Sequence, residues 1–136
     1  MKPAILAAAA ALAVLATSAA QAGEASSGPA IEPQLNLEQK ALLRCSAAFG
    51  IIAGEQQRGI ESAQAYPSLG ERGREYFVRA GAQLMDDLGL TRDQIDAMMR
   101  AEVAALQEQS VAADNPRAIV DAVMQPCLIA LDASGL

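Results

Sequence analysis

The fold is decided by the segment Asn36-Leu-Glu-Gln-Lys-Ala-Leu-Leu-Arg-Cys-Ser-Ala-Ala-Phe-Gly-Ile-Ile-Ala-Gly-Glu-Gln-Gln-Arg-Gly59. Its apolar side chains recur with the 3.6-residue period of an α-helix. Asn36 followed three residues later by Gln39 is a capping-box start, and Gly59 is a typical residue just past a helix end. The sequence therefore predicts a helix that begins after Asn36 and ends near Arg58.

Similar start signals recur along the rest of the chain. Ser68 with Glu71 and Thr91 with Gln94 fit two more capping boxes, and Asn115 precedes a proline that suits the first helical position. Apolar residues with a helical period follow each start. No useful stretch alternates with period two, so we expect no strands.

These signals predict an all-α fold, a small bundle of about four helices in a single domain over residues 36–136. The second helix should stop at Gly89. Residues 60–67 should form a short turn of helix followed by an extended bend, because Pro67 disfavours helical geometry in the residue before it. Pro126 lies inside the last helix and should kink it.

The first 22 residues have the pattern of a cleaved signal peptide. Lys2 precedes an apolar run from residue 4 to residue 16, which is short for a membrane span, and the run is followed by Ala20-Gln-Ala22. We expect cleavage before Gly23, export to a bacterial periplasm and no membrane attachment afterwards. Residues 23–35 should be a flexible lead-in, because they have no period and contain two prolines and two glycines.

Cys45 and Cys127 are the two cysteines of the chain. In an oxidising compartment, two cysteines in a small domain usually form one structural disulfide, which would here join the first helix to the last. A redox-active or metal-binding pair is the alternative. It lacks a C-x-x-C spacing and a third soft ligand, although Arg44 is placed to lower a thiol pKa.

Composition limits the chemistry. The 136 residues include no histidine and no tryptophan, two tyrosines and two phenylalanines, and the formal net charge is −6. Histidine-ligated haem, histidine-containing zinc sites and imidazole bases are therefore excluded. An acidic chain with few aromatic residues is a poor nucleic-acid binder. No nucleophile elbow or phosphate-binding glycine loop occurs, and no carboxylate pair stands out. We expect a protein that is not an enzyme and needs no cofactor.

Four glycines interrupt the first two expected helices. Gly50 and Gly54 are four residues apart in the first, and Gly73 and Gly81 share a face of the second. Each such glycine costs about 1 kcal/mol relative to alanine. The favoured interpretation is a tight crossing between the two helices, so that Gly50→Leu would destabilise the fold by overpacking. The alternative is a groove that accepts a ligand or a partner segment.

Arginines are dense at the start of the second helix. Glu71–Arg74 and Glu75–Arg79 have the spacings of surface ion pairs on a helix. The alternative is that Arg72, Arg74 and Arg79 together hold an anionic ligand or an acidic partner.

Two other clusters suggest metals only weakly. The acidic residues lack the spacing, central glycine and closing glutamate of an EF-hand, and methionines at helical core positions are usually hydrophobic packing. We expect no metal site at either the acidic cluster (Asp86, Asp87, Asp93, Asp96) or the methionines (Met85, Met98, Met99, Met124).

Three stretches, at residues 43–49 (Leu-Arg-Cys-Ser-Ala-Ala-Phe), 70–79 (Gly-Glu-Arg-Gly-Arg-Glu-Tyr-Phe-Val-Arg) and 123–128 (Val-Met-Gln-Pro-Cys-Leu), carry a resemblance. The chain resembles small exported, two-cysteine helical proteins of alphaproteobacteria, and this resemblance implies no function and no site residue. In general plan the chain is also similar to periplasmic acid-stress chaperones, although it shares no motif with them.

The sequence therefore favours an exported helical protein that binds another protein or a small apolar ligand. One concrete version is a periplasmic holdase that suppresses aggregation of an unfolded client at low pH. The main alternative is a small-molecule or metal carrier that uses the bundle interior. If such a ligand or partner surface exists, its candidate residues are Gly50, Gly54, Arg72, Arg74 and Arg79.

Overall fold

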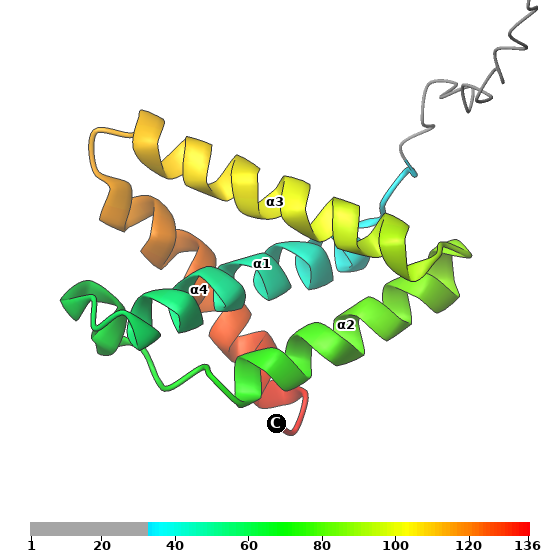
Figure 1. Cartoon of the computed structure of the whole chain (residues 1–136), viewed down its shortest axis with the longest axis horizontal. Helices are drawn as coiled ribbons and strands as arrows, with labels where there is room; N and C mark the ends of the chain where they lie inside the picture. Colours follow the sequence, from blue (N-terminus) through cyan, green and yellow to red (C-terminus); the bar gives the residue numbers. More distant parts are fainter. Residues whose placement is uncertain (1–32) are drawn as a thin grey trace, which may run out of the picture. The chain divides into compact units, whose positions relative to one another are not determined.

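A computed structural model describes residues 33–136 of the chain (Figure 1). Within that range the chain forms four α-helices, one short 3-10 helix and no strand, which confirms the all-α bundle. The helices are α1 Leu37–Gln57, η1 Glu61–Ala65, α2 Arg72–Leu88, α3 Arg92–Ala112 and α4 Pro116–Ala133. The expected signal peptide over residues 1–22, and all but the last three residues of the expected flexible segment 23–35, lie outside the described residues.

Three of the four expected helix starts are confirmed. The side chain of Asn36 accepts the N–H of Gln39 at 2.8 Å, and the side chain of Gln39 accepts the N–H of Asn36 at 3.0 Å. Thr91 and Gln94 form the same reciprocal pair at the start of α3. Asn115 caps α4 by accepting a backbone N–H from the first turn of that helix. Local side chains therefore fix where these helices begin.

The two expected helix ends are also confirmed. Gly59 follows α1 with a φ of 73°, and Gly89 follows α2 with a φ of 63°. A positive φ is the left-handed conformation that glycine adopts without steric cost, and it turns the chain out of each helix.

The expected capping box at Ser68 is wrong. α2 begins at Arg72, and Glu71 precedes it without a side-chain cap. The N–H of Leu69 donates instead to the side chain of Gln56 at 3.0 Å, and the Leu69 side chain is fully buried. The backbone before α2 is thus fixed by burial of the Leu69 side chain and by the hydrogen bond from the Leu69 N–H to the Gln56 side chain.

The segment between α1 and α2 follows the expected pattern. η1 provides the short turn of helix, and Tyr66 then adopts an extended conformation, with φ −91° and ψ 157°. The side-chain amide of Gln56 donates to the carbonyls of Ala63 and Pro67, at 3.1 and 2.9 Å. This one side chain therefore provides hydrogen bonds to backbone carbonyls in a segment that has no α-helix or strand to pair them.

α1 is the central helix of the described unit. It packs against α2, α3 and α4 (Figure 1). The run Cys45–Phe49 is buried at all five consecutive positions, so the middle of α1 is covered on every side. A helical period of apolar residues is typical of a helix with one buried face, but a helix enclosed by its neighbours has no solvent face at its centre.

The core consists of two neighbouring clusters of buried side chains. The larger cluster lies mainly between α1, α2 and α4, and includes an edge-to-face contact of Phe49 with Tyr76, with ring centres 5.1 Å apart. The smaller cluster joins α1 to the α2–α3 end through Leu43, Leu84, Ile95 and Met99. The interior is filled by side chains from all four α-helices.

The expected disulfide is confirmed. Cys45 of α1 and Cys127 of α4 are bonded, with Cα atoms 5.2 Å apart and 82 residues between them in sequence. Both residues are buried in the larger core cluster. α4 continues through Pro126, and the kink expected there stays a prediction.

The glycines of α1 do not form the tight helix crossing that the sequence favoured. A Cβ added to Gly50 would meet no atom within 4 Å, and one added to Gly54 would meet only the end of the Arg58 side chain. The close approach occurs at Gly73 of α2, where an added Cβ would lie 3.2 Å from Cβ of Phe49. The expectation that Gly50→Leu overpacks the core is therefore wrong, because a Cβ added at Gly50 would enter open space.

Candidate binding surfaces

The first candidate site is an apolar groove between three helices, called the α1/α3/α4 groove below. Its volume is about 230 Å³. The fully buried Ile52 and Met124 line it, and Val111 of α3 is 85% exposed beside them. The residues that line it are Ala48, Ile51, Ile52, Glu55, Leu106, Gln107, Ser110, Val111, Ile119, Val120, Val123 and Met124.

Glu55 is the one charged side chain of this groove. It takes part in no ion pair within residues 33–136. Gln107 and Ser110 add polar groups from α3, while the other lining side chains are apolar. The groove therefore presents an apolar surface with one available negative charge.

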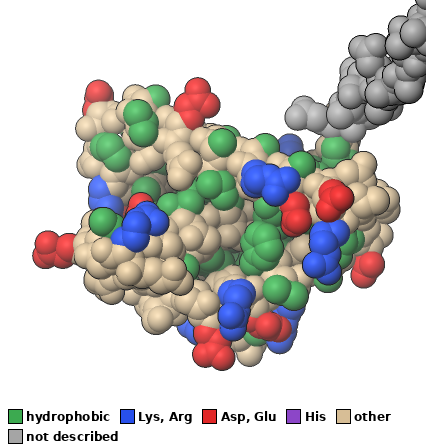
Figure 2. Space-filling model, viewed as in Figure 1, with side chains coloured by type: hydrophobic (Ala, Val, Ile, Leu, Met, Phe, Trp, Pro, Cys, Tyr) green, Lys and Arg blue, Asp and Glu red, His purple; other side chains and the backbone are tan. Residues whose placement is uncertain are grey.

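The second candidate site, called the Ser46 groove, opens between α1, α2 and α3. Figure 2 shows hydrophobic side chains on this face, in the middle of the unit, with positive and negative side chains close by. The groove measures about 260 Å³ and is lined mainly by apolar groups. Its lining residues are Ser46, Ala47, Gly50, Phe77, Asp96, Met99, Arg100 and Val103.

Ser46 is the unusual residue of the second groove. It is 1% exposed, and its hydroxyl is the only buried side-chain polar atom without a hydrogen-bond partner among the described residues. Gly50 lies one helical turn further along α1 and also lines the groove, so the absence of a side chain there leaves it open.

Two of the three arginines singled out in the sequence form ion pairs in the structure. Arg72 pairs with Asp132 at 2.7 Å and donates to the carbonyl of Leu136, so it ties the C-terminal end to α2. Arg79 forms the expected pair with Glu75 at 3.1 Å.

Arg74 is exposed. The expected pair of Arg74 with Glu71 is not formed in the described structure. Two residues along a helix place Arg72 and Arg74 on different faces, so these side chains do not converge on one anion site.

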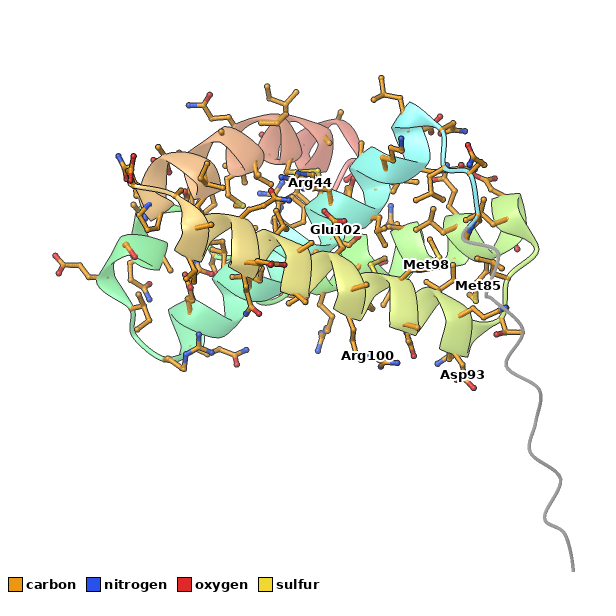
Figure 3. All side chains as sticks on the ribbon, turned by 90° about the horizontal axis from the view of Figure 1, so that it is seen from above. Arg44, Met85, Asp93, Met98, Arg100 and Glu102 are labelled. Atoms are coloured by element: carbon orange, nitrogen blue, oxygen red, sulfur yellow. A yellow bond between two sulfur atoms is a disulfide. The ribbon has the colours of Figure 1, made fainter. Side chains whose placement is uncertain are left out.

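Arg44 carries a contact that the sequence did not reveal. It donates to Glu102 at 3.0 Å and to Gln109 at 2.9 Å, which links α1 to α3 (Figure 3). Its partners lie 58 and 65 residues away in sequence, so no local spacing could have indicated them. The arrangement leaves Arg44 engaged with α3, while its neighbour Cys45 is bonded to α4.

A second polar network joins η1 to α4. The hydroxyl of Tyr66 donates to Asp121, and Arg117 pairs with the same carboxylate at 3.0 Å. The Arg117 guanidinium also lies over the Tyr66 ring, 4.8 Å from its centre. Burial, followed by the hydrogen bond to Asp121, raises the pKa of Tyr66 to about 12 from its ordinary 10.0.

This network predicts a loss of stability in alkali. The raised pKa means that the folded state favours the neutral phenol, so its contribution is present below pH 10 and is lost as the pH rises through about 12. We expect the free energy of unfolding of the native protein to fall over that range. The free energy of unfolding of the Tyr66→Phe variant should fall less. Urea unfolding at several alkaline pH values checks this. An equal fall in both proteins would contradict it.

The structure gives no support to the metal alternatives. Residues 33–136 contain no group of three His, Cys, Asp or Glu side chains placed to hold an ion. Met85 and Met98 lie near one another between α2 and α3 (Figure 3), and both pack against the smaller core cluster together with Met99. Met124 belongs to the larger cluster. The methionines therefore serve as packing groups.

No helix in the described part of the chain is both long enough and apolar enough to span a membrane. Comparison of the chain with protein-family models, with curated proteins and with solved structures gives no match. The two grooves and their chemistry are therefore the basis for a functional proposal.

Proposed function

We propose that this protein is a non-enzymatic binding protein that holds an amphipathic segment of another protein in the α1/α3/α4 groove. The groove itself is the observation that supports this most. Apolar side chains from three helices line one open space of about 230 Å³, and Val111 beside it remains 85% exposed. Apolar surface of this kind commonly marks an interaction site on a soluble protein.

The shape and charge of the groove favour one kind of occupant. An amphipathic helix binds such a groove by inserting apolar side chains spaced three and four residues apart. Glu55 offers a negative charge that no described residue neutralises, and the whole chain carries a formal charge of −6. The partner segment should therefore carry a lysine or arginine next to its apolar anchors.

Export to the periplasm is part of the proposal. It is supported by the signal-peptide pattern of residues 1–22, with cleavage before Gly23. The Cys45–Cys127 disulfide is compatible with an oxidising compartment. A holdase is the version in which many unfolded clients share the groove, and such clients should compete with a defined peptide for it.

A peptide titration tests the proposal. The probe is a fluorescent helical peptide with leucines at positions i, i+3, i+4 and i+7 and one flanking lysine, measured by anisotropy. We expect saturable binding that Val111→Asp weakens roughly tenfold, because a charge would replace an apolar contact of the groove. Ile129→Asp is the matched control, since Ile129 is 72% exposed on α4 and lines neither groove.

The charge is tested separately. Replacing the peptide lysine by glutamate should weaken binding to the native chain, and Glu55→Gln should remove most of that difference. Equal losses of peptide affinity in Val111→Asp and Ile129→Asp would contradict the proposed site. A failure of both peptides to bind would contradict it as well.

A further inference from the structure

We infer that a second copy of this chain binds in the α1/α3/α4 groove through the outer face of its α2, defined by Arg74, Phe77 and Val78. The inference rests on the proposed function, because it uses the same groove and names one partner for it. Three features support it: exposed apolar side chains on α2, an unpaired arginine beside them, and an unpaired carboxylate in the groove.

The outer face of α2 leaves two large apolar side chains in contact with solvent. Phe77 is 38% exposed and Val78 is 58% exposed. The other large apolar side chains exposed outside the groove are Leu37, Ile60 and Ile129, which come from three separate parts of the chain. Within the described residues, α2 therefore carries the one adjacent pair of such side chains.

Arg74 supplies the positive charge that the groove favours in its occupant. It lies three residues before Phe77 and four before Val78, so the three side chains lie on the same side of α2. Arg74 is exposed and forms no ion pair with any residue in the range 33–136. Two apolar anchors beside a basic side chain are the pattern expected of a helix that binds in this groove.

The groove has the complementary chemistry. Its apolar side chains come from three helices, and Glu55 is its one charged side chain, without an ion pair among the described residues. The guanidinium of Arg74 placed beside Glu55 forms a charge-assisted hydrogen-bonded pair. Phe77 and Val78 are then removed from water against the apolar walls, which favours the complex.

α2 does not reach the groove of its own chain. Its buried side packs against α1, and none of the groove's lining residues belongs to α2. The outer face of α2 and the groove are different surfaces, so every copy offers both, and contact between copies is head to tail. One helix face in one groove makes a small interface, and both copies are acidic, so we expect weak, concentration-dependent association.

Sedimentation velocity of the protein at increasing concentration measures this association. We expect the native protein to be monomeric when dilute and to form dimers or larger species as its concentration rises. Val78→Asp on α2 and Val111→Asp in the groove should each weaken the association roughly tenfold. Ile129→Asp is the matched control and should not, since Ile129 is exposed on α4 outside both surfaces. Circular dichroism checks that each variant keeps its helices.

A mixture of two variants tests the head-to-tail arrangement. Val78→Asp keeps an intact groove, and Val111→Asp keeps an intact outer face of α2. At a concentration where each variant alone is monomeric, an equimolar mixture should form a heterodimer and nothing larger, because only one intact pair of surfaces remains.

A charge exchange tests the contact between Arg74 and Glu55. Arg74→Glu and Glu55→Arg should each weaken self-association, and the two substitutions combined in one chain should restore it, because the opposite charges then meet again between copies. Arg92→Glu combined with Glu55→Arg is the control and should not restore it. Arg92 is also exposed and unpaired within residues 33–136, but it lies on α3 outside both surfaces.

The inference is overturned if the native protein stays monomeric at every concentration, if Val78→Asp associates as strongly as the native protein, or if the mixture of variants stays monomeric. The Val78→Asp variant should still bind the amphipathic basic peptide, because its groove is intact, and excess peptide should dissociate the native oligomers. Peptide binding without self-association would overturn this inference alone. Self-association without peptide binding would overturn the proposed function alone.

Discussion

Replacement of both Cys45 and Cys127 by alanine is expected to lower the free energy of unfolding by about 2–4 kcal/mol. The disulfide closes a loop of 82 residues between α1 and α4. The chain-entropy model assigns a loop of that length about 4.5 kcal/mol, and measured values are usually smaller. In a small domain with a total stability of about 5–15 kcal/mol, this is a large share.

Thermal unfolding by circular dichroism measures this effect, with an expected fall in melting temperature of roughly 10–25 °C. A reductant should destabilise the native protein in the same direction and leave the double variant unchanged. A native protein whose melting temperature does not respond to reduction, although free thiols appear, would show that the disulfide adds little to stability.

Replacement of Gly73 by leucine is expected to destabilise the fold by about 2 kcal/mol or more through overpacking. A Cβ at this position would lie 3.2 Å from Cβ of Phe49 and 3.3 Å from Cβ of Leu69. Both neighbours are fully buried, so neither can move into solvent. The gain of about 1 kcal/mol in helix propensity is too small to offset this.

Gly50→Leu is the matched substitution in α1. Because an added Cβ meets nothing within 4 Å there, the propensity gain should dominate and stabilise the fold by about 0.5–1 kcal/mol. Urea unfolding of the two variants beside the native protein should therefore give shifts of opposite sign. Shifts of the same sign would contradict the assignment of the close helix approach to Gly73.

Local sequence signals were sufficient to predict the structure where a short segment determines its own conformation. Asn36 with Gln39 and Thr91 with Gln94 start helices as expected, because a capping box involves only residues three apart. Gly59 ends α1 as expected for the same local reason. The disulfide could also be predicted, since only two cysteines were present to pair.

Predictions failed where the outcome depends on how helices meet. The helical period of α1 predicted which positions are apolar, but it could not show that Gly50 borders open space while Gly73 lies against Phe49 of α1. Ser68 had the right spacing for a cap, yet α2 begins only at Arg72 and the Leu69 side chain is buried, which the spacing could not show.

The candidate sites were predictable only in small part. Gly50 was singled out from the sequence as part of a possible groove, and it does line the Ser46 groove. The orphan state of the Ser46 hydroxyl and the free charge of Glu55 depend on what surrounds them in three dimensions. The α1/α3/α4 groove combines residues from three helices that no single stretch of sequence brings together.

Photocrosslinking of the amphipathic basic peptide to the protein tests the central claim most directly. A peptide with a photoreactive leucine analogue at one anchor position is irradiated in the complex, and the modified residues are identified by mass spectrometry. The account predicts crosslinks to groove residues from all three helices, such as Ile51, Val111 and Ile119. Crosslinks concentrated instead at the exposed Leu37 or Ile129 would contradict it.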